Sequence, residues 1–126
     1  MKTAAGTGIG IAGAAGALAR YAVDGLVLKR TGGGFPWGTL VVNVTGSFLL
    51  GVFFVLLAER VTIAPWIRSS LLIGFIGAYT TFSTLSLETF RLFEDGAHLL
   101  ALANGLGSLL AGLLAVYGGI VVGRAV

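Results

Sequence analysis

The stretch GFIGAYTTFSTLS, residues 74–86, decides how the rest of this chain is interpreted. It lies in the middle of an apolar segment long enough to cross a bilayer, yet it contains two glycines and five serines and threonines. Glycine weakens a helix, and clustered Ser and Thr side chains offer the backbone other hydrogen-bond partners. Irregular backbone at membrane depth is tolerated only where protein buries it or where it lines a polar cavity. The stretch therefore predicts a breakable membrane helix and a site for an ion or a small solute.

The composition favours a protein that lies in a lipid bilayer. Of the 126 residues, 56% are hydrophobic and 10% are charged, and the mean hydropathy is +0.99. A soluble domain carries about 25% charged residues, so this chain could not cover its surface with polar groups. The absence of cysteine excludes a disulfide framework and a thiolate metal site, and five acids with one histidine leave little for an enzyme. The net charge of +3 is dispersed, so we expect neither an enzyme nor a nucleic-acid binder.

Four apolar segments are long enough for transmembrane helices, which need about 20 residues each. They cover residues 3–28, 37–58, 66–90 and 97–122. The connections between them are short, so we predict one all-α membrane domain over residues 1–126, with the third of its four transmembrane helices broken at mid-membrane. Four packed helices leave no room for a pore at their own centre. A conduction path is therefore expected at an interface between copies of the chain.

Positive charges are shared almost evenly between the two ends of the predicted bundle. One end carries four and the other three: Lys2, Arg60, Arg68 and Arg124 against Lys29, Arg30 and Arg91. Lys and Arg normally concentrate on the cytoplasmic side. The near-equality predicts insertion in both orientations, which permits an antiparallel dimer. The alternative is a weak bias that partners or lipids resolve.

Two asparagines lie inside apolar segments. An amide in hydrocarbon must find partners. For Asn43, one interpretation is an interhelical hydrogen bond worth about 1 kcal/mol. Because Thr39 and Ser47 are nearby, we favour a donor that solvates a permeating anion. Asn104 and Ser108 are four residues apart and share a helix face, either as a packing contact or as one wall of a pathway.

An aromatic and a cationic side chain are further candidates. Phe82 stands among hydroxyl side chains, where an electropositive ring edge can face an anion, although buried phenylalanines are usually simple core. Arg20 is the only cation well inside an apolar segment. Its head group could reach the interface, pair with Asp24 four residues on, or supply positive potential at an aqueous vestibule.

Three motifs resemble those of the CrcB/Fluc family of fluoride channels. They are GAAGALARY at residues 13–21, PWGTLVVNVTGSFLLG at residues 36–51 and GFIGAYTTFSTLSLE at residues 74–88. Their order, spacing and placement on the first three apolar segments agree with the family, and the resemblance extends over essentially the whole chain. It implies an antiparallel, dual-topology homodimer with two fluoride pores.

The resemblance also implies a structural sodium ion at the dimer centre. Its ligands would be the backbone carbonyls of Gly77 and Thr80 from both subunits, at a break in the third helix. Unwound carbonyls bind Na⁺ in other membrane proteins. The residues implied to line the fluoride pathway are Asn43 and Phe82, with Ser83, Thr84 and Ser108 as hydroxyl donors and Arg20 near the vestibule.

The sequence departs from the family pattern on two helices. Leu85 stands where a second pore phenylalanine is common, and the polar track of the fourth helix lacks hydroxyls at Gly112 and Val116. An aromatic lining with one ring fewer would change conductance or fluoride affinity and leave the fold intact. A heterodimer with a paralogous subunit that restores these groups is therefore an alternative to the homodimer.

The expected function is passive, fluoride-selective export by a multi-pass channel in the plasma or inner membrane of a prokaryote. The alternative is a small four-helix, proton-coupled multidrug antiporter, which needs a carboxylate embedded in the membrane. Asp24 and Glu88 instead lie near the ends of their segments. A structural subunit without transport would not need the hydroxyl-rich stretch.

Overall fold

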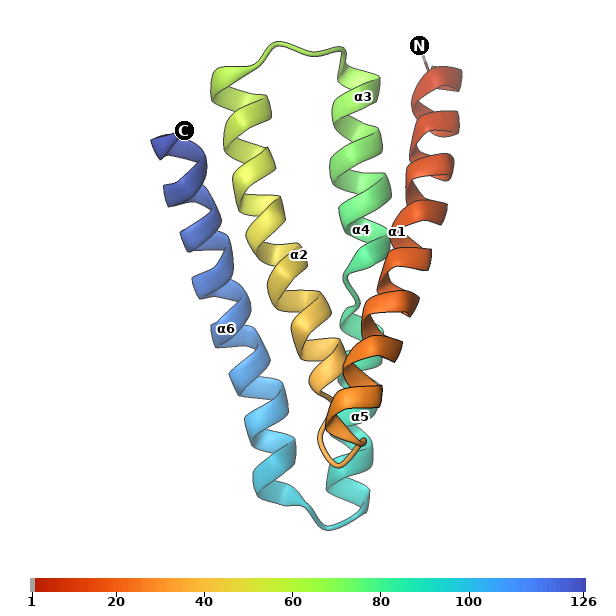
Figure 1. Ribbon diagram of the computed structural model, residues 1–126, viewed down its shortest axis with the longest axis vertical. Helices are drawn as coiled ribbons and strands as arrows, with labels where there is room; N and C mark the ends of the chain where they lie inside the picture. Colours follow the sequence, from red (N-terminus) through yellow and green to blue (C-terminus); the bar gives the residue numbers. More distant parts are fainter. Residues whose placement is uncertain (1) are drawn as a thin grey trace.

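The computed structural model describes residues 2–126 and shows four long helical segments, with no strand in that range (Figure 1). The first two are α1 (Lys2–Thr31) and α2 (Trp37–Val55), the latter continued by the wider π-helical turns of η1 (Leu56–Arg60). The third comprises α3 (Pro65–Ser69), η2 (Ser70–Ile76), α4 (Gly77–Tyr79) and α5 (Phe82–Glu94). The fourth is α6 (His98–Ala125). The prediction of an all-α chain with four apolar helices is confirmed.

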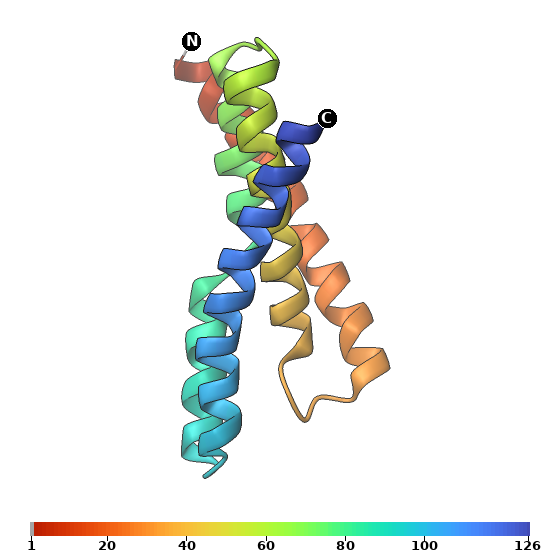
Figure 2. The same ribbon diagram turned by 90° about the vertical axis from the view of Figure 1, so that its left-hand side faces the viewer.

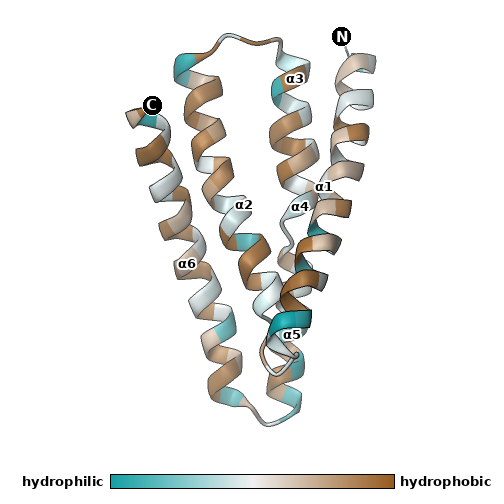
Figure 3. Cartoon of the chain, viewed as in Figure 1, coloured by the Kyte–Doolittle hydropathy of each residue, from teal (hydrophilic) through white to brown (hydrophobic). Residues whose placement is uncertain are grey.

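The outer surface of the helices suits a bilayer. All four segments are long and apolar enough to cross a membrane. Large apolar side chains point outward along them, such as Leu18 and Leu114, which are 69% and 71% exposed. Figure 3 shows apolar residues along most of each helix and the most polar ones mainly near the ends. Because lipid tails are as apolar as leucine, such a surface carries no penalty in a membrane.

The helices form a bundle that is open at one end. Figure 1 shows both chain ends beside the connection from η1 to α3, as four spans require. At the opposite end, Figure 2 shows α5 and α6 diverging together from α1 and α2. Contacts of α5 with the rest of the chain are made mainly with α6. α5 therefore packs along α6 and largely away from α1 and α2.

Glycine sets how closely two of these helices approach. A Cβ atom on Gly16 of α1 would overlap the carbonyl oxygen of Phe75 in η2, so only glycine fits this crossing. Such contacts replace the hydrophobic driving force that lipid cannot supply between helices. Gly6 and Gly10, on the same helix, face open space, because a Cβ atom on either would have no neighbour within 4 Å. The glycines of α1 therefore serve intrachain packing at Gly8 and Gly16, where a Cβ atom would overlap the Ser70 hydroxyl or the Phe75 carbonyl, and not at Gly6 or Gly10.

Arginines tie the helix ends together where the termini lie. Arg60 donates to the carbonyl oxygen of Val126 at 3.1 Å and also to that of Arg124. Arg124 in turn forms an ion pair with Glu59 at 3.5 Å. Because the last carbonyls of a helix have no partners inside it, a cationic donor at that end is favourable. The arginines thus join η1 to the end of α6.

The break in the third segment lies at Thr80 and Thr81. Both have extended backbones, with φ and ψ of −81° and 159° at Thr80 and −151° and 112° at Thr81. The Thr81 hydroxyl accepts a hydrogen bond from the backbone N–H of Thr84 at 3.2 Å, which caps the start of α5. Thr is among the residues that favour this position. The prediction of a broken third helix is confirmed.

Candidate functional site

Asn43 on α2 satisfies both backbone hydrogen-bonding groups of Thr81. Its Nδ2 donates to the Thr81 carbonyl oxygen at 3.0 Å, and the Thr81 N–H donates to Asn43 Oδ1 at 2.7 Å. Extended backbone in an apolar setting must have such partners, because an unpaired buried N–H or C=O is costly. The amide therefore stabilises the break from the neighbouring helix.

The same hydrogen bonds free two carbonyls at the break. In a continuous helix the N–H of Thr81 would donate to the Gly77 carbonyl, and that of Thr84 to the Thr80 carbonyl. Here Thr81 donates to Asn43 and Thr84 donates to the Thr81 hydroxyl. Gly77 and Thr80 thus lose their helical donors and present hard oxygen atoms suited to an alkali or alkaline-earth cation.

Two other carbonyls near the break are hydrogen-bonded, that of Ala78 by a side chain and that of Ile76 by its usual helical donor together with a hydroxyl. Arg20 Nε donates to the carbonyl oxygen of Ala78 at 3.2 Å. The Ile76 carbonyl accepts from both the N–H and the hydroxyl of Thr80, at 3.1 Å and 3.0 Å. Arg20 therefore reaches the break from α1, and its guanidinium caps the first half of the third segment.

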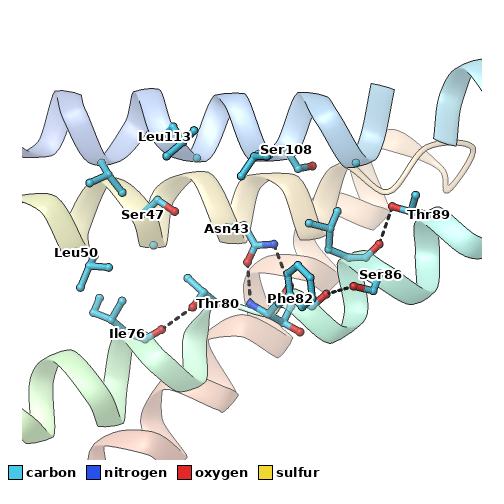
Figure 4. Close-up of a pocket in the computed structure, with 17 residues that line it drawn as sticks. Asn43, Ser47, Leu50, Ile76, Thr80, Phe82, Ser86, Thr89, Ser108 and Leu113 are labelled. Carbon is cyan, nitrogen blue, oxygen red and sulfur yellow. Dashed lines mark hydrogen bonds between the residues drawn. The ribbon is translucent and has the colours of Figure 1, made fainter. Parts of the chain in front are cut away.

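A pocket of about 630 Å³ lies between α2, α5 and α6 beside the break (Figure 4). Its polar lining residues are Asn43, Ser47, Thr80, Thr81, Ser86, Thr89 and Ser108. Its larger apolar lining residues are Leu50, Ile76, Phe82, Leu85, Leu109, Leu113 and Val116. None of the residues that line it is charged. An ion in this pocket would meet neutral donors, one aromatic ring and aliphatic side chains, and no charged group.

Three of the residues implied by the family resemblance meet in this pocket. Phe82 is the first residue of α5 and is 82% exposed, and it lines the same pocket as Asn43 (Figure 4). Ser108 projects from α6 on the opposite wall. Its hydroxyl is buried and has no hydrogen-bond partner among residues 2–126. The pocket thus combines an amide, a ring edge and an uncommitted hydroxyl.

The other residues implied for the fluoride pathway and its vestibule lie elsewhere. Arg20 and Thr84 line a second cavity of about 30 Å³, together with Asp24, Thr39 and other residues. A volume of this size holds a water molecule. Ser83 is exposed and lines neither cavity, with its hydroxyl 3.4 Å from that of Thr81. The hydroxyls of the stretch therefore face several directions.

Sequence reasoning missed Thr81 and left the role of Asn104 open. Thr81 was one hydroxyl among several, although a Thr directly before a helix is a capping signal that could have identified it. Asn104 is fully buried and donates to the Thr89 hydroxyl at 3.0 Å. It therefore packs α6 against α5, whereas Ser108 on the same face lines the pocket.

The comparisons with known proteins identify the family of this chain. The family model described as CrcB-like protein, Camphor Resistance (CrcB), matches residues 7–120. The chain belongs to the CrcB/Fluc family of fluoride channels. It is thus a multi-pass membrane protein of a channel family and not an enzyme. No similarity supports the multidrug antiporter.

Several curated CrcB/Fluc proteins are close in sequence. The fluoride-specific ion channel FluC of Magnetococcus marinus is 47% identical over 116 residues, which cover 92% of this chain and 94% of that protein. A protein with the same name from a Geobacter species is 48% identical over 117 residues, covering 93% and 94%. The relative from Methylococcus capsulatus is 49% identical over 116 residues, which make up only 51% of its length.

Proposed function

We propose that this protein is a fluoride-selective ion channel that lets fluoride leave the prokaryotic cytoplasm passively and so gives fluoride resistance. The observation that carries this proposal is the coupling of Asn43 to the break, which places the exposed ring of Phe82 beside an amide in an uncharged pocket. The names of the CrcB/Fluc relatives support the choice of ion.

Selectivity in this proposal comes from weak, neutral contacts. A fluoride ion in the pocket would accept from the second N–H of Asn43 and from the hydroxyl of Ser108, and it would face the positive edge of the Phe82 ring. Conduction requires binding that is favourable enough for entry and weak enough for release. An uncharged lining meets this requirement because no cation inside the pocket traps the ion.

We propose further that two copies of the chain, inserted in opposite orientations, form a homodimer with two pathways. The near-equal distribution of positive charge supports dual insertion. The open face of the pocket and the exposed ring of Phe82 support an interface there, because a partner would complete the wall of the pathway. A heterodimer with a paralogous subunit is the alternative assembly.

The carbonyls of Gly77 and Thr80 are the proposed ligands of a structural sodium ion at the dimer centre. Their fit to the ion is supported by the loss of their helical donors to Asn43 and to the Thr81 hydroxyl. Two carbonyls from each subunit would supply four hard oxygen atoms. The ion would hold the two breaks together and would not be transported.

Arg20 is proposed to act at the mouth of the pathway. Its place beside the small cavity with Thr84 supports a vestibule in which positive potential raises the local fluoride concentration. The exposed hydroxyl of Ser83 lies next to the break and would offer a further donor to an entering ion. The cation would thus attract the ion at the entrance, outside the uncharged pocket.

The test is fluoride efflux from liposomes that contain the purified protein, followed with a fluoride electrode. We expect fluoride release at a rate set by the membrane potential, no chloride release under the same gradient, and no accompanying proton movement. Equal release of chloride would contradict selectivity. Strict proton coupling would favour an antiporter, and no release from an intact dimer would favour a structural subunit.

A further inference from the structure

We infer that Ser47 is a further anion-binding residue of this pathway, one helical turn beyond Asn43, and that Gly112 leaves the space it needs. This inference rests on the proposed fluoride channel function. Asn43 and Ser47 are four residues apart on α2, so both side chains project from the same face. Both line the pocket between α2, α5 and α6, as Figure 4 shows.

The opposite wall of the pocket is formed by α6, and it carries no hydroxyl at the level of Ser47. Ser108, Gly112 and Val116 follow one another at four-residue spacing on α6, and all three line the pocket. Only Ser108 among them carries a donor. Ser47 Oγ lies 3.7 Å from the position that a Cβ atom on Gly112 would occupy. The Ser47 hydroxyl therefore stands beside the place where the side chain of residue 112 would begin.

Most other hydroxyls in the pocket are committed to the backbone. The side chains of Thr80, Ser86 and Thr89 donate to the carbonyl oxygens four residues earlier, at 3.0, 3.0 and 2.8 Å. Each would have to break that hydrogen bond to donate to an anion. Ser108 has no such commitment. The neutral donors that remain for an ion are the amide of Asn43 and a pair of hydroxyls, one from each wall.

The position of Ser47 matters because the pocket becomes apolar beyond it. The next lining residue on α2 is Leu50, and Leu113 and Val116 face it from α6. An ion that has lost part of its water shell needs successive donors, since an unsolvated charge in an apolar site is very costly. Ser47 thus adds a hydrogen-bond donor one helical turn beyond Asn43. Its hydroxyl lies next to the space that the missing side chain of Gly112 leaves on α6.

The inference predicts that the hydroxyl can be moved from one helix to the other. Ser47→Ala should lower the fluoride efflux rate about tenfold or more, the loss expected for one hydrogen bond to a charged group. Adding Gly112→Ser to that variant should restore the rate to within about threefold of wild type, an allowance within the usual context dependence of single hydrogen bonds. Adding Gly112→Ala instead supplies the extra carbon without the oxygen and should restore nothing.

The outcomes separate this inference from the proposed function. If the wild-type protein releases no fluoride, both the channel function and the role of Ser47 are rejected. If the wild type conducts and Ser47→Ala conducts equally, only the role of Ser47 is overturned. Rescue by Gly112→Ala as well as by Gly112→Ser, or by neither, would also overturn it. Thermal unfolding of each variant in detergent identifies any loss of rate that comes from misfolding.

Discussion

Asn43 and Thr81 are joined by two hydrogen bonds, one in each direction, although 38 positions separate them in the chain. The pair replaces, with one side chain, the two backbone contacts that Thr81 would make inside a helix. Removing the amide would therefore leave the N–H and the C=O of Thr81 without partners, and it would also change the lining of the pocket.

The first prediction concerns that amide. Asn43→Asp should lower fluoride efflux at least about a hundredfold, because a carboxylate offers no donor to the Thr81 carbonyl and places a negative charge in the pocket. Electrode-detected efflux from liposomes measures the change. Asn104→Ala is the control, because it removes a buried amide that bonds Thr89 and does not line the pocket. It should lower thermal stability and keep fluoride selectivity. Wild-type efflux in the Asn43→Asp variant would refute the assignment.

Leu85 offers a test by gain of function. It lies one turn from Phe82 on α5 and lines the same pocket. Leu85→Phe should raise the efflux rate or lower the half-saturating fluoride concentration several-fold, because a second ring edge would face the ion. Leu85→Met keeps an apolar side chain without a ring and should change neither. Equal effects of Phe and Met at this position would show that side-chain size, and not the ring, matters.

Substitution of Gly16 should lower the stability of the fold, although Gly16 does not line the pocket. Gly16→Ala places a methyl group against the Phe75 carbonyl and should destabilise the fold by about 1–3 kcal/mol, the usual cost of overpacking. Gly10→Ala lies on the same helix in open space and should be neutral or slightly stabilising. Thermal unfolding in detergent compares the two. A larger loss at Gly10 would instead place that residue in the contact between subunits.

Arg20 combines a structural and an electrostatic role that substitution can separate. Arg20→Gln removes the charge at the vestibule, whereas Arg20→Lys keeps the charge and loses the planar donor to Ala78. Efflux at low fluoride concentration should fall several-fold in the Gln variant and less in the Lys variant. The difference should shrink in high salt, because salt screens attraction over about 10 Å at 0.1 M ionic strength. A difference that is unchanged by salt would assign Arg20 a purely structural role.

Removal of sodium tests the proposed carbonyl site. Purification and assay in potassium, or in a large organic cation, should lower thermal stability and efflux together, because the freed carbonyls of Gly77 and Thr80 would lose their ligand. Return of sodium should restore both. The ionic strength is held constant, and chloride efflux serves as the control for membrane integrity. Unchanged stability without sodium would contradict the site.

The sequence predicted the architecture well, because the signals that define it are local. Four apolar segments and a stretch rich in glycine and hydroxyls are enough to predict four helices and a break. Asn43, Phe82 and Ser108, which the resemblance implied, line one pocket, and their role in fluoride passage stays a prediction. In each of these cases the information lies in the residue type and its place along one helix.

The parts that sequence could not predict depend on the geometry of the break. Two extended residues separate α4 from α5, so helical periodicity does not carry from one half to the other. The directions of Ser83 and Thr84 therefore could not be derived by counting residues. The capping of Ala78 by Arg20 spans 58 positions and depends on how α1 crosses the third segment. The role that we infer for Ser47 rests on its place in the pocket and on its distance to Gly112, and neither can be derived from sequence.

The reliance of α5 on α6 has a consequence for how the protein is made. The ribosome releases α5, with Phe82 at its start, before the helix on which it mainly rests. A nascent chain with only three inserted segments therefore holds α5 without its support and lacks the wall that carries Ser108. In the proposed channel, the pathway would therefore be complete only after the last segment enters the bilayer.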